Sequence, residues 1–180
     1  MSKKFSVLLF SLLLVGCFGK KRTTYGTTPT ITVAASENPN GNAKEPSKNH
    51  PQNLLADAIV ESAMKFTGTR YRYGGTTKKG MDCSGLIYVA LQENDIIFPR
   101  VSTAMANEGK RIGLVKAQKG DLLFFKTRKR GKKINHVGLV VSVDGDDIKF
   151  IHASTSRGVI VSSLREGYWN SAFVKATRIL

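Results

Sequence analysis

Three side chains in the C-terminal two thirds of this 180-residue chain have the types needed for nucleophilic catalysis, namely Cys83, His136 and His152. Cys83 follows Asp82 at the expected start of a helix, where a thiol faces unpaired backbone N–H groups. The partial positive charge at that end lowers the pKa of a thiol, and the same N–H groups can hold a developing oxyanion. A cysteine nucleophile also needs a base, and the base needs a group that orients it. The sequence therefore predicts a site that brings both histidines to Cys83.

The two histidines can meet only if the strands that carry them pair in a suitable register. His136 opens the segment HVGLVVSV and His152 closes IKFIHAS, with the expected turn DGDD between them. Each histidine lies eight residues from Asp144, so both fall at the same end of a hairpin. A two-residue turn alone would place them on opposite faces, whereas a three-residue loop or a β-bulge would place them on one face. We predict the odd-length loop or a bulge, with His136 as the base and His152 fixing its tautomer.

Each of these residues also has a simpler interpretation. A lone cysteine is more often a small buried apolar residue than a nucleophile, and a histidine at a strand end is more often structural. One cysteine and two histidines also suit zinc, although zinc sites usually contain closely spaced ligand pairs and these three residues are far apart in the sequence. The residues by themselves favour catalysis and leave the other two interpretations open.

The first 52 residues predict export and a membrane anchor. Residues 1–16 contain two lysines and then an apolar stretch too short to span a bilayer, which is typical of a signal peptide. The stretch ends in LVGC, which resembles a bacterial lipobox and predicts that Cys17 carries a lipid; a plain signal peptide with an incidental Cys17 is the alternative. Residues 17–52 are polar and lack periodicity, so they are expected to form a disordered tether. Acylation of Cys17 would leave Cys83 a free thiol.

Residues 53–180 predict one α+β domain. Apolar periodicity indicates helices at 54–66, 83–93 and 103–109, the second capped by Asp82 and the third by Ser102, with a glycine-rich loop at 71–80. Short β-branched and aromatic segments then alternate with turn residues, at 121–126, 136–143, 148–154, 158–163 and 173–180. Helices followed by strands predict N-terminal helices packed on a C-terminal antiparallel sheet.

The formal charge of +15 indicates an anionic surface, polymer or membrane as a partner. Six of the eight residues from Lys126 to Lys133 are basic, and this run directly precedes the segment that begins with His136. The run is either a solvated hairpin tip or a contact for anionic wall polymers or lipid head groups. Nucleic acid is not expected as the partner of an exported lipoprotein.

Several segments together resemble the NlpC/P60 family of cysteine peptidases: RYRYGGTTKKGMDCSGLIYVAL, KGDLLFF, NHVGLVV and FIHASTSRGVIVSS. The likeness covers about residues 54–180, is strongest to the Spr-type murein endopeptidase lipoproteins, and keeps the DCSG, HVG and HAS blocks in the family's order. It implies a papain-like fold in which Cys83 is the nucleophile, His136 the general base and His152 the orienting residue. The basic run 126–133 departs from the short loop expected of the family.

The resemblance also implies substrate contacts and a reaction. Tyr71 matches a tyrosine placed beside the nucleophile, where its hydroxyl supports the oxyanion or the substrate. Asp82 and Ser84 flank the nucleophile and touch substrate in family members, although a helix cap and a first-turn residue explain both. The implied reaction is hydrolysis of peptide bonds in peptidoglycan through a thioester on Cys83, without a metal or other cofactor.

The Spr-type likeness implies cleavage of D-alanyl–diaminopimelate cross-links. Cleavage of γ-D-glutamyl–diaminopimelate bonds, transacylation, and a non-catalytic wall-binding role are the alternatives. Phe18 and Gly19 follow Cys17 with no acidic residue, which by resemblance favours the periplasmic face of a bacterial outer membrane. We expect a monomer that reaches peptidoglycan from a lipid anchor at Cys17.

Overall fold

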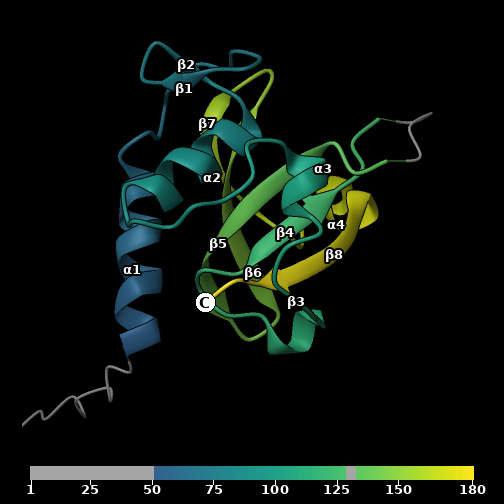
Figure 1. Ribbon diagram of the computed structural model, residues 1–180. Helices are drawn as coiled ribbons and strands as arrows, with labels where there is room; N and C mark the ends of the chain where they lie inside the picture. The colour runs from purple at the N-terminus through teal and green to yellow at the C-terminus, as the bar shows by residue number, and fades with distance from the viewer. Residues whose placement is uncertain (1–50, 129–132) are drawn as a thin grey trace, which may run out of the picture. The chain divides into compact units, whose positions relative to one another are not determined.

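The computed structural model describes residues 51–128 and 133–180 (Figure 1). The predicted signal peptide, the lipidated Cys17 and the tether lie outside these residues, as do positions 129–132 of the basic run. The helices are α1 (Pro51–Met64), α2 (Cys83–Gln92), α3 (Ser102–Met105), the 3-10 turn η1 (Leu114–Lys116) and α4 (Gly167–Ala172). The strands are β1 (Thr76–Thr77), β2 (Gly80–Met81), β3 (Lys110–Ile112), β4 (Leu122–Phe125), β5 (His136–Asp144), β6 (Asp147–Ser154), β7 (Gly158–Ser163) and β8 (Phe173–Arg178). Among the described residues, no helix combines the length and the apolar character needed to cross a membrane.

Strands β3 to β8 form one six-stranded antiparallel sheet in the order β3-β8-β4-β5-β6-β7. Helix α2 packs against β5 and β6, and α1 packs against α2, so the two N-terminal helices lie beside the sheet as Figure 1 shows. The predicted α+β fold, with N-terminal helices on a C-terminal antiparallel sheet, is therefore confirmed. All five predicted strands are present as β4 to β8.

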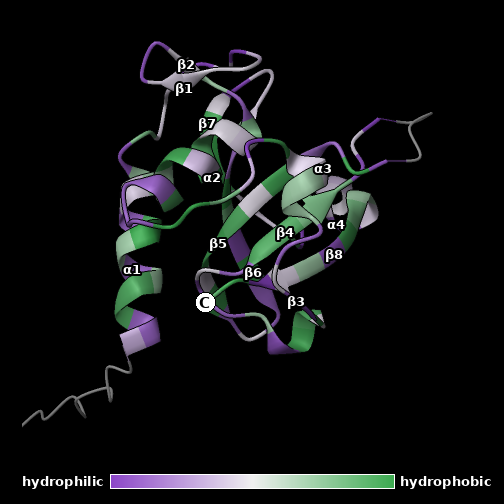
Figure 2. Cartoon of the chain, viewed as in Figure 1, coloured by the Kyte–Doolittle hydropathy of each residue, from purple (hydrophilic) through white to green (hydrophobic). Residues whose placement is uncertain are grey.

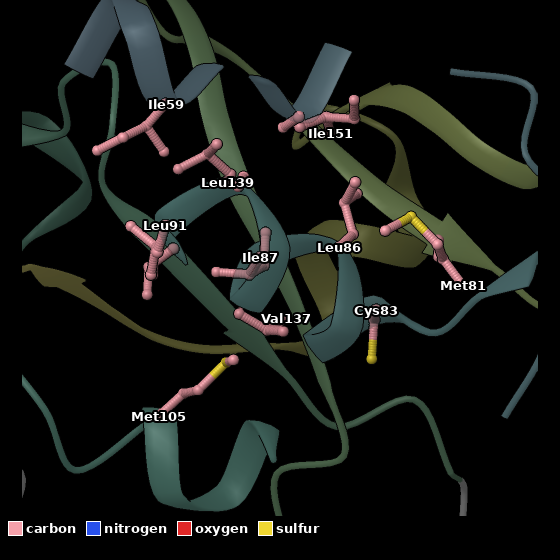
Figure 3. Packing of buried hydrophobic residues seen from close by; sticks show 14 of the residues in the cluster. Ile59, Met81, Cys83, Leu86, Ile87, Leu91, Met105, Val137, Leu139 and Ile151 are labelled. Atoms are coloured by element: carbon pink, nitrogen blue, oxygen red, sulfur yellow. The ribbon is translucent and has the colours of Figure 1, made fainter. Parts of the chain in front are cut away.

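The sheet is buried on both faces, which explains why β4 reads LLFF instead of alternating apolar and polar residues. Leu122 and Phe124 belong to a cluster with α1, α2 and α3, whereas Leu123 and Phe125 belong to a second cluster with α4. Green, apolar segments accordingly run along both the central strands and the inner side of the helices in Figure 2. Figure 3 shows the first cluster, in which side chains of α2 meet side chains of β5: Leu86, Ile87, Leu91, Val137 and Leu139.

Some local predictions were wrong. Ser102 does not cap α3: it is the first helical residue, and the extended Val101 occupies the flanking position without a side-chain hydrogen bond. The predicted loop at 71–80 contains the short β1–β2 ladder, which the glycine-rich sequence concealed. Strand β3, η1 and α4 were also missed, because none of them is longer than six residues and none shows a sustained period. The first helix begins at Pro51, a residue that suits a first helical position because it lacks an N–H.

The predicted bulge in the β5–β6 hairpin is confirmed. Asp144 pairs with Asp147 around a two-residue turn, a register that would place His136 and His152 on opposite faces. The register shifts between Val140 and Ser142, so that Leu139 pairs with Ile151. Beyond this shift the two histidines share a face, one diagonal position apart.

Gly138, in the HVG block of β5, is required by the close packing of the next strand. A Cβ at this position would lie 2.5 Å from Cδ2 of Phe150 and 3.2 Å from the carbonyl oxygen of Ile151. Phe150 is fully buried in the α4-side cluster, so its ring has little room to move.

We predict that Gly138→Ala lowers the free energy of unfolding by about 1–3 kcal/mol, because the extra methyl group overpacks a filled site. Gly113→Ala is the matched control, since a Cβ there would meet nothing within 4 Å. Urea denaturation of the two variants and the parent protein measures the difference. Equal stability of the two variants would show that Phe150 can move away without cost.

Candidate active site

Cys83 is held at the N-terminus of α2 by the residue before it. Asp82 is the N-cap of this helix, as predicted, and its Oδ1 accepts a hydrogen bond of 2.6 Å from the backbone N–H of Gly85. Figure 3 shows Cys83 at the margin of the first apolar cluster, with its sulfur directed away from Leu86 and Ile87. The thiol is not paired in a disulfide. Cys83 and His136 both line one cavity of about 740 Å³.

The two histidines and a serine form a buried hydrogen-bonded chain. Nε2 of His136 lies 3.1 Å from Nδ1 of His152, and Nε2 of His152 lies 3.1 Å from Oγ of Ser162 on β7. All three side chains are buried. The contact to His152 occupies Nε2 of His136 and leaves Nδ1 as the ring nitrogen available to accept a proton. For Nδ1 to be that acceptor, Nε2 of His136 must donate to His152, and Nε2 of His152 must donate to Ser162.

Aromatic side chains enclose both imidazoles. The His136 ring stacks on Trp169 of α4, with centroids 5.3 Å apart and an interplanar angle of 24°, and His152 meets the same indole edge-on at 4.5 Å. Phe125 contacts both rings of this pair, with its centroid 6.0 Å from that of His136 and 5.1 Å from that of Trp169. Burial lowers the pKa of His136 to about 4, and burial together with the charges of His136 and Arg157 lowers the pKa of His152 to about 3. Both imidazoles are therefore neutral at pH 7, and His136 can act as a base.

The predicted low pKa of the nucleophile is wrong for the unliganded protein. Burial raises the pKa of the Cys83 thiol above its ordinary value, and the negative charge of Asp82 acts in the same direction. Backbone amides of Val137, Ser84 and Cys83 itself favour the thiolate but do not outweigh the desolvation. The resting pair is therefore a neutral thiol and a neutral imidazole, and a base must remove the thiol proton during attack.

Tyr71 lies where the resemblance expects it, at the wall of the cavity that holds Cys83. It is half-buried and forms an isolated bridge to Met81, close to the start of α2. Burial raises the pKa of its phenol, and the charges of Cys83 and Asp82 raise it further. The hydroxyl is therefore a proton donor at neutral pH, which is the form that can stabilise an oxyanion.

Arg100 and Asp82 form a network beside the nucleophile. Nη1 of Arg100 donates to Oδ1 of Asp82 and to Oγ of Ser84, both at 3.0 Å, and Nη2 donates to Oδ2 of Asp82 at 3.2 Å. The second carboxylate oxygen of Asp82 also accepts the N–H of Gly74 at 2.7 Å. Both oxygens of Asp82 are thus occupied within the protein, which fits the interpretation as a helix cap better than a direct contact to substrate.

Three residues of the site were not singled out from the sequence: Arg100, Ser162 and Trp169. The hairpin arithmetic that related the two histidines would have found Ser162, because Ser154 pairs with Gly158 and His152 and Ser162 then share a face. No comparable signal marks Arg100, which lies in a loop, or Trp169, which lies in a six-residue helix.

The first residues of the basic run 126–133 lie at the edge of the cavity that Cys83 lines. Arg128 and Thr127 line the cavity of Cys83, and Lys126 borders a neighbouring cavity with them. Lys126, Arg128 and Lys133 are exposed, and the residues between Arg128 and Lys133 lie outside the described structure. Within residues 51–128 and 133–180, no group of three or more His, Cys, Asp or Glu side chains is arranged to hold a metal ion.

The lowered histidine pKa values predict a loss of stability in mild acid. The folded protein binds fewer protons than the unfolded chain between about pH 4 and pH 6.5, so stability is complete above pH 6.5 and falls as the pH drops below it. We expect a loss of about 2 kcal/mol per histidine between pH 8 and pH 5.

Urea denaturation at half-unit pH intervals measures how steeply the unfolding free energy changes with pH. The slope equals the difference in bound protons between the unfolded and folded states, and His152→Gln should reduce that difference by up to one proton. An unfolding free energy that stays constant from pH 5 to pH 6.5 would contradict the burial of neutral imidazoles.

Comparison with known proteins agrees with this geometry. Residues 68–178 match the NlpC/P60 family. The chain is 40% identical over 136 residues to the probable endopeptidase NlpC of Escherichia coli K12, covering 72% of this chain and 85% of that protein. It is 36% identical over 135 residues to the murein DD-endopeptidase MepS/murein LD-carboxypeptidase of the same organism, covering 72% and 68%.

A solved structure has the same fold. The NlpC/P60 family protein from Bacillus cereus superposes with a TM-score of 0.63 at 30% identity, over 69% of this chain and 40% of that one. The match thus extends over most of the described residues and includes the elements that carry Cys83, His136 and His152. The chain is a member of the NlpC/P60 family.

Proposed function

We propose that this protein is a peptidoglycan endopeptidase that uses Cys83 as nucleophile, His136 as general base and His152 as the orienting residue. The observation that carries the proposal is the buried chain from His136 through His152 to Ser162, which ends at the cavity that Cys83 lines. The name of one relative gives the substrate class, since that similar protein is called a murein DD-endopeptidase.

The first half of the reaction forms a thioester. Nδ1 of His136 takes the proton of the Cys83 thiol while the sulfur attacks the carbonyl carbon of the scissile peptide bond. The oxyanion is held by the phenol of Tyr71 and by backbone N–H groups at the start of α2. The C–N bond then breaks, and the His136 imidazolium gives its proton to the leaving amine.

The second half returns the enzyme to its starting state. His136, neutral again, removes a proton from water as the water oxygen attacks the thioester carbonyl. The C–S bond breaks, and the imidazolium returns the proton to the Cys83 sulfur. An amine acceptor in place of water would give transacylation, and product analysis distinguishes the two.

The remaining residues named from the resemblance have supporting roles in this proposal. Asp82 and Ser84, both bound to Arg100, hold the first turn of α2 and hence the position of Cys83. Tyr71 faces the substrate. Exposed Lys126 and Arg128 attract anionic wall polymer to the edge of the cavity, by an interaction that salt screens.

We propose further that the domain works at the cell wall as an exported lipoprotein anchored through Cys17, at the periplasmic face of an outer membrane. The support is the sequence of residues 1–17 together with the murein substrate named for one relative. Among the possible substrates, we propose the D-alanyl–diaminopimelate cross-link, because a similar protein is called a murein DD-endopeptidase.

The first prediction of this proposal is Cys83-dependent cleavage of cross-linked peptidoglycan. The purified protein should convert cross-linked dimers to intact tetrapeptide monomers, and Cys83→Ala should abolish the conversion, as measured by separation and mass spectrometry of the muropeptides. If the stems are instead cut between D-Glu and diaminopimelate, the proposed catalytic residues are retained and only the assignment of the cleaved bond changes. Unchanged muropeptides with folded wild-type protein would leave a wall-binding scaffold as the better interpretation.

The second prediction concerns Ser162, whose hydroxyl can accept from Nε2 of His152 and so support the tautomer in which His136 carries its proton on Nε2. Ser162→Ala should lower kcat roughly tenfold and shift the acidic limb of the kcat pH profile, because it leaves Nε2 of His152 buried without its partner. Ser162→Thr, which keeps the hydroxyl, should retain most of the activity. Ser142→Ala, an exposed position on β5, is the control for removal of a strand serine.

An unchanged pH profile for Ser162→Ala, with only reduced stability, would show that Ser162 has a structural role alone.

A further inference from the structure

A second cavity, which Cys83 does not line, adjoins His136. It has a volume of about 280 Å³ and lies between the β6–β7 turn and the start of α4. It shares His136, Thr127, Thr155 and Tyr168 with the larger cavity, but Cys83, Tyr71 and Arg100 line only the larger one. The two cavities are therefore neighbours, and His136 lines both.

The proposed chemistry assigns a different part of the substrate to each cavity. The acyl part becomes bonded to Cys83 and must lie in the larger cavity. The amine part receives its proton from His136 and must leave from the side of that imidazole. The scissile nitrogen itself stays beside Cys83 and Nδ1 of His136, so the smaller cavity, which His136 also lines, is the place for groups attached beyond that nitrogen.

The smaller cavity carries a cation that has no partner. Arg157, in the β6–β7 turn, lines it and makes no hydrogen bond or ion pair with any side chain in the described part of the chain. Its charge is close enough to the catalytic pair to lower the pKa of His152. Glu166 is the only carboxylate in the lining, and one of its oxygens already accepts the N–H of Ser163 at 3.1 Å.

We propose that this cavity binds a leaving group whose amine-bearing carbon also carries a free carboxylate, and that Arg157 recognises that carboxylate. The inference rests on the proposed function and deepens it. In a D-alanyl–diaminopimelate cross-link, the scissile nitrogen is attached to a carbon with a free carboxylate, as it is in any bond cut by a carboxypeptidase. In a γ-D-glutamyl–diaminopimelate bond of a tetrapeptide stem, the corresponding carboxyl is consumed in the next peptide bond. Arg157 therefore favours the first class of bond.

A binding experiment tests the subsite separately from catalysis. In the Cys83→Ala protein, which cannot form the thioester, dissociation constants are measured by calorimetry for two ligands. One is the cross-linked tetrapeptide dimer, and the other is the same dimer with the free carboxylate of the leaving diaminopimelate amidated. We expect the dimer with the free carboxylate to bind roughly three- to tenfold more tightly than the amidated dimer, because a partly exposed charged pair contributes a modest binding free energy.

Substitutions then assign the selectivity to one side chain. Adding Arg157→Ser should remove the difference between the two ligands, and adding Glu166→Gln should increase it, because a repelling charge is lost. Arg111→Ser removes the same charge from an exposed position on β3, at the opposite edge of the sheet, and should leave the difference unchanged.

Equal binding of the two ligands by Cys83→Ala, or undiminished selectivity in Arg157→Ser, would overturn the subsite. Failure of the proposed function gives a different result, namely wild-type protein that cuts neither dimer. Selective binding that depends on Arg157 would then still support the cavity as a carboxylate site.

Discussion

The register shift in the β5–β6 hairpin is the constraint on which the rest of the site depends. A tight two-residue turn joins the strands, and by itself it would send His136 and His152 to opposite faces of the sheet. The bulge at Val141 restores a common face, and only then can the two imidazoles approach to 3.1 Å. Everything beyond this point, including the contact to Ser162 and the stacking on Trp169, requires both rings on the α4 side.

Burial of the site determines how its proton transfers work. The aromatic side chains that orient the imidazoles also remove them from water, which keeps both neutral. Burial at the start of α2 separately raises the pKa of the Cys83 thiol. A preformed thiolate–imidazolium pair is therefore not the resting state of the unliganded protein. In the proposed reaction, attack by Cys83 is coupled to proton transfer to His136, and the hydrogen-bonded chain behind His136 can supply the tautomer that this transfer needs.

The cleft is asymmetric in a way that matches the two products of a peptide cleavage. On the nucleophile side, the charge of Arg100 is matched by Asp82 and serves to hold the helix start. In the smaller cavity beside His136, the guanidinium of Arg157 has no such partner in the described residues. Under the proposed assignment, a carboxylate would be bound beside the leaving amine and not beside the acyl group.

The sequence by itself determined the α+β fold, the five main strands, the Asp82 cap and the need for either an odd-length loop or a bulge, because each follows from local periodicity, helix-end chemistry or the two-residue period of a strand. Residue spacing and family resemblance also singled out Cys83, His136 and His152, which the structure brings to one cavity and one hydrogen-bonded chain, while their catalytic roles stay a prediction. Tertiary structure alone decided the sign of the Cys83 pKa shift, since desolvation depends on what packs around the thiol and not on its position in a helix. It likewise decided the contacts of Arg100, Trp169 and Arg157, which come from loops and short elements whose position depends on long-range packing.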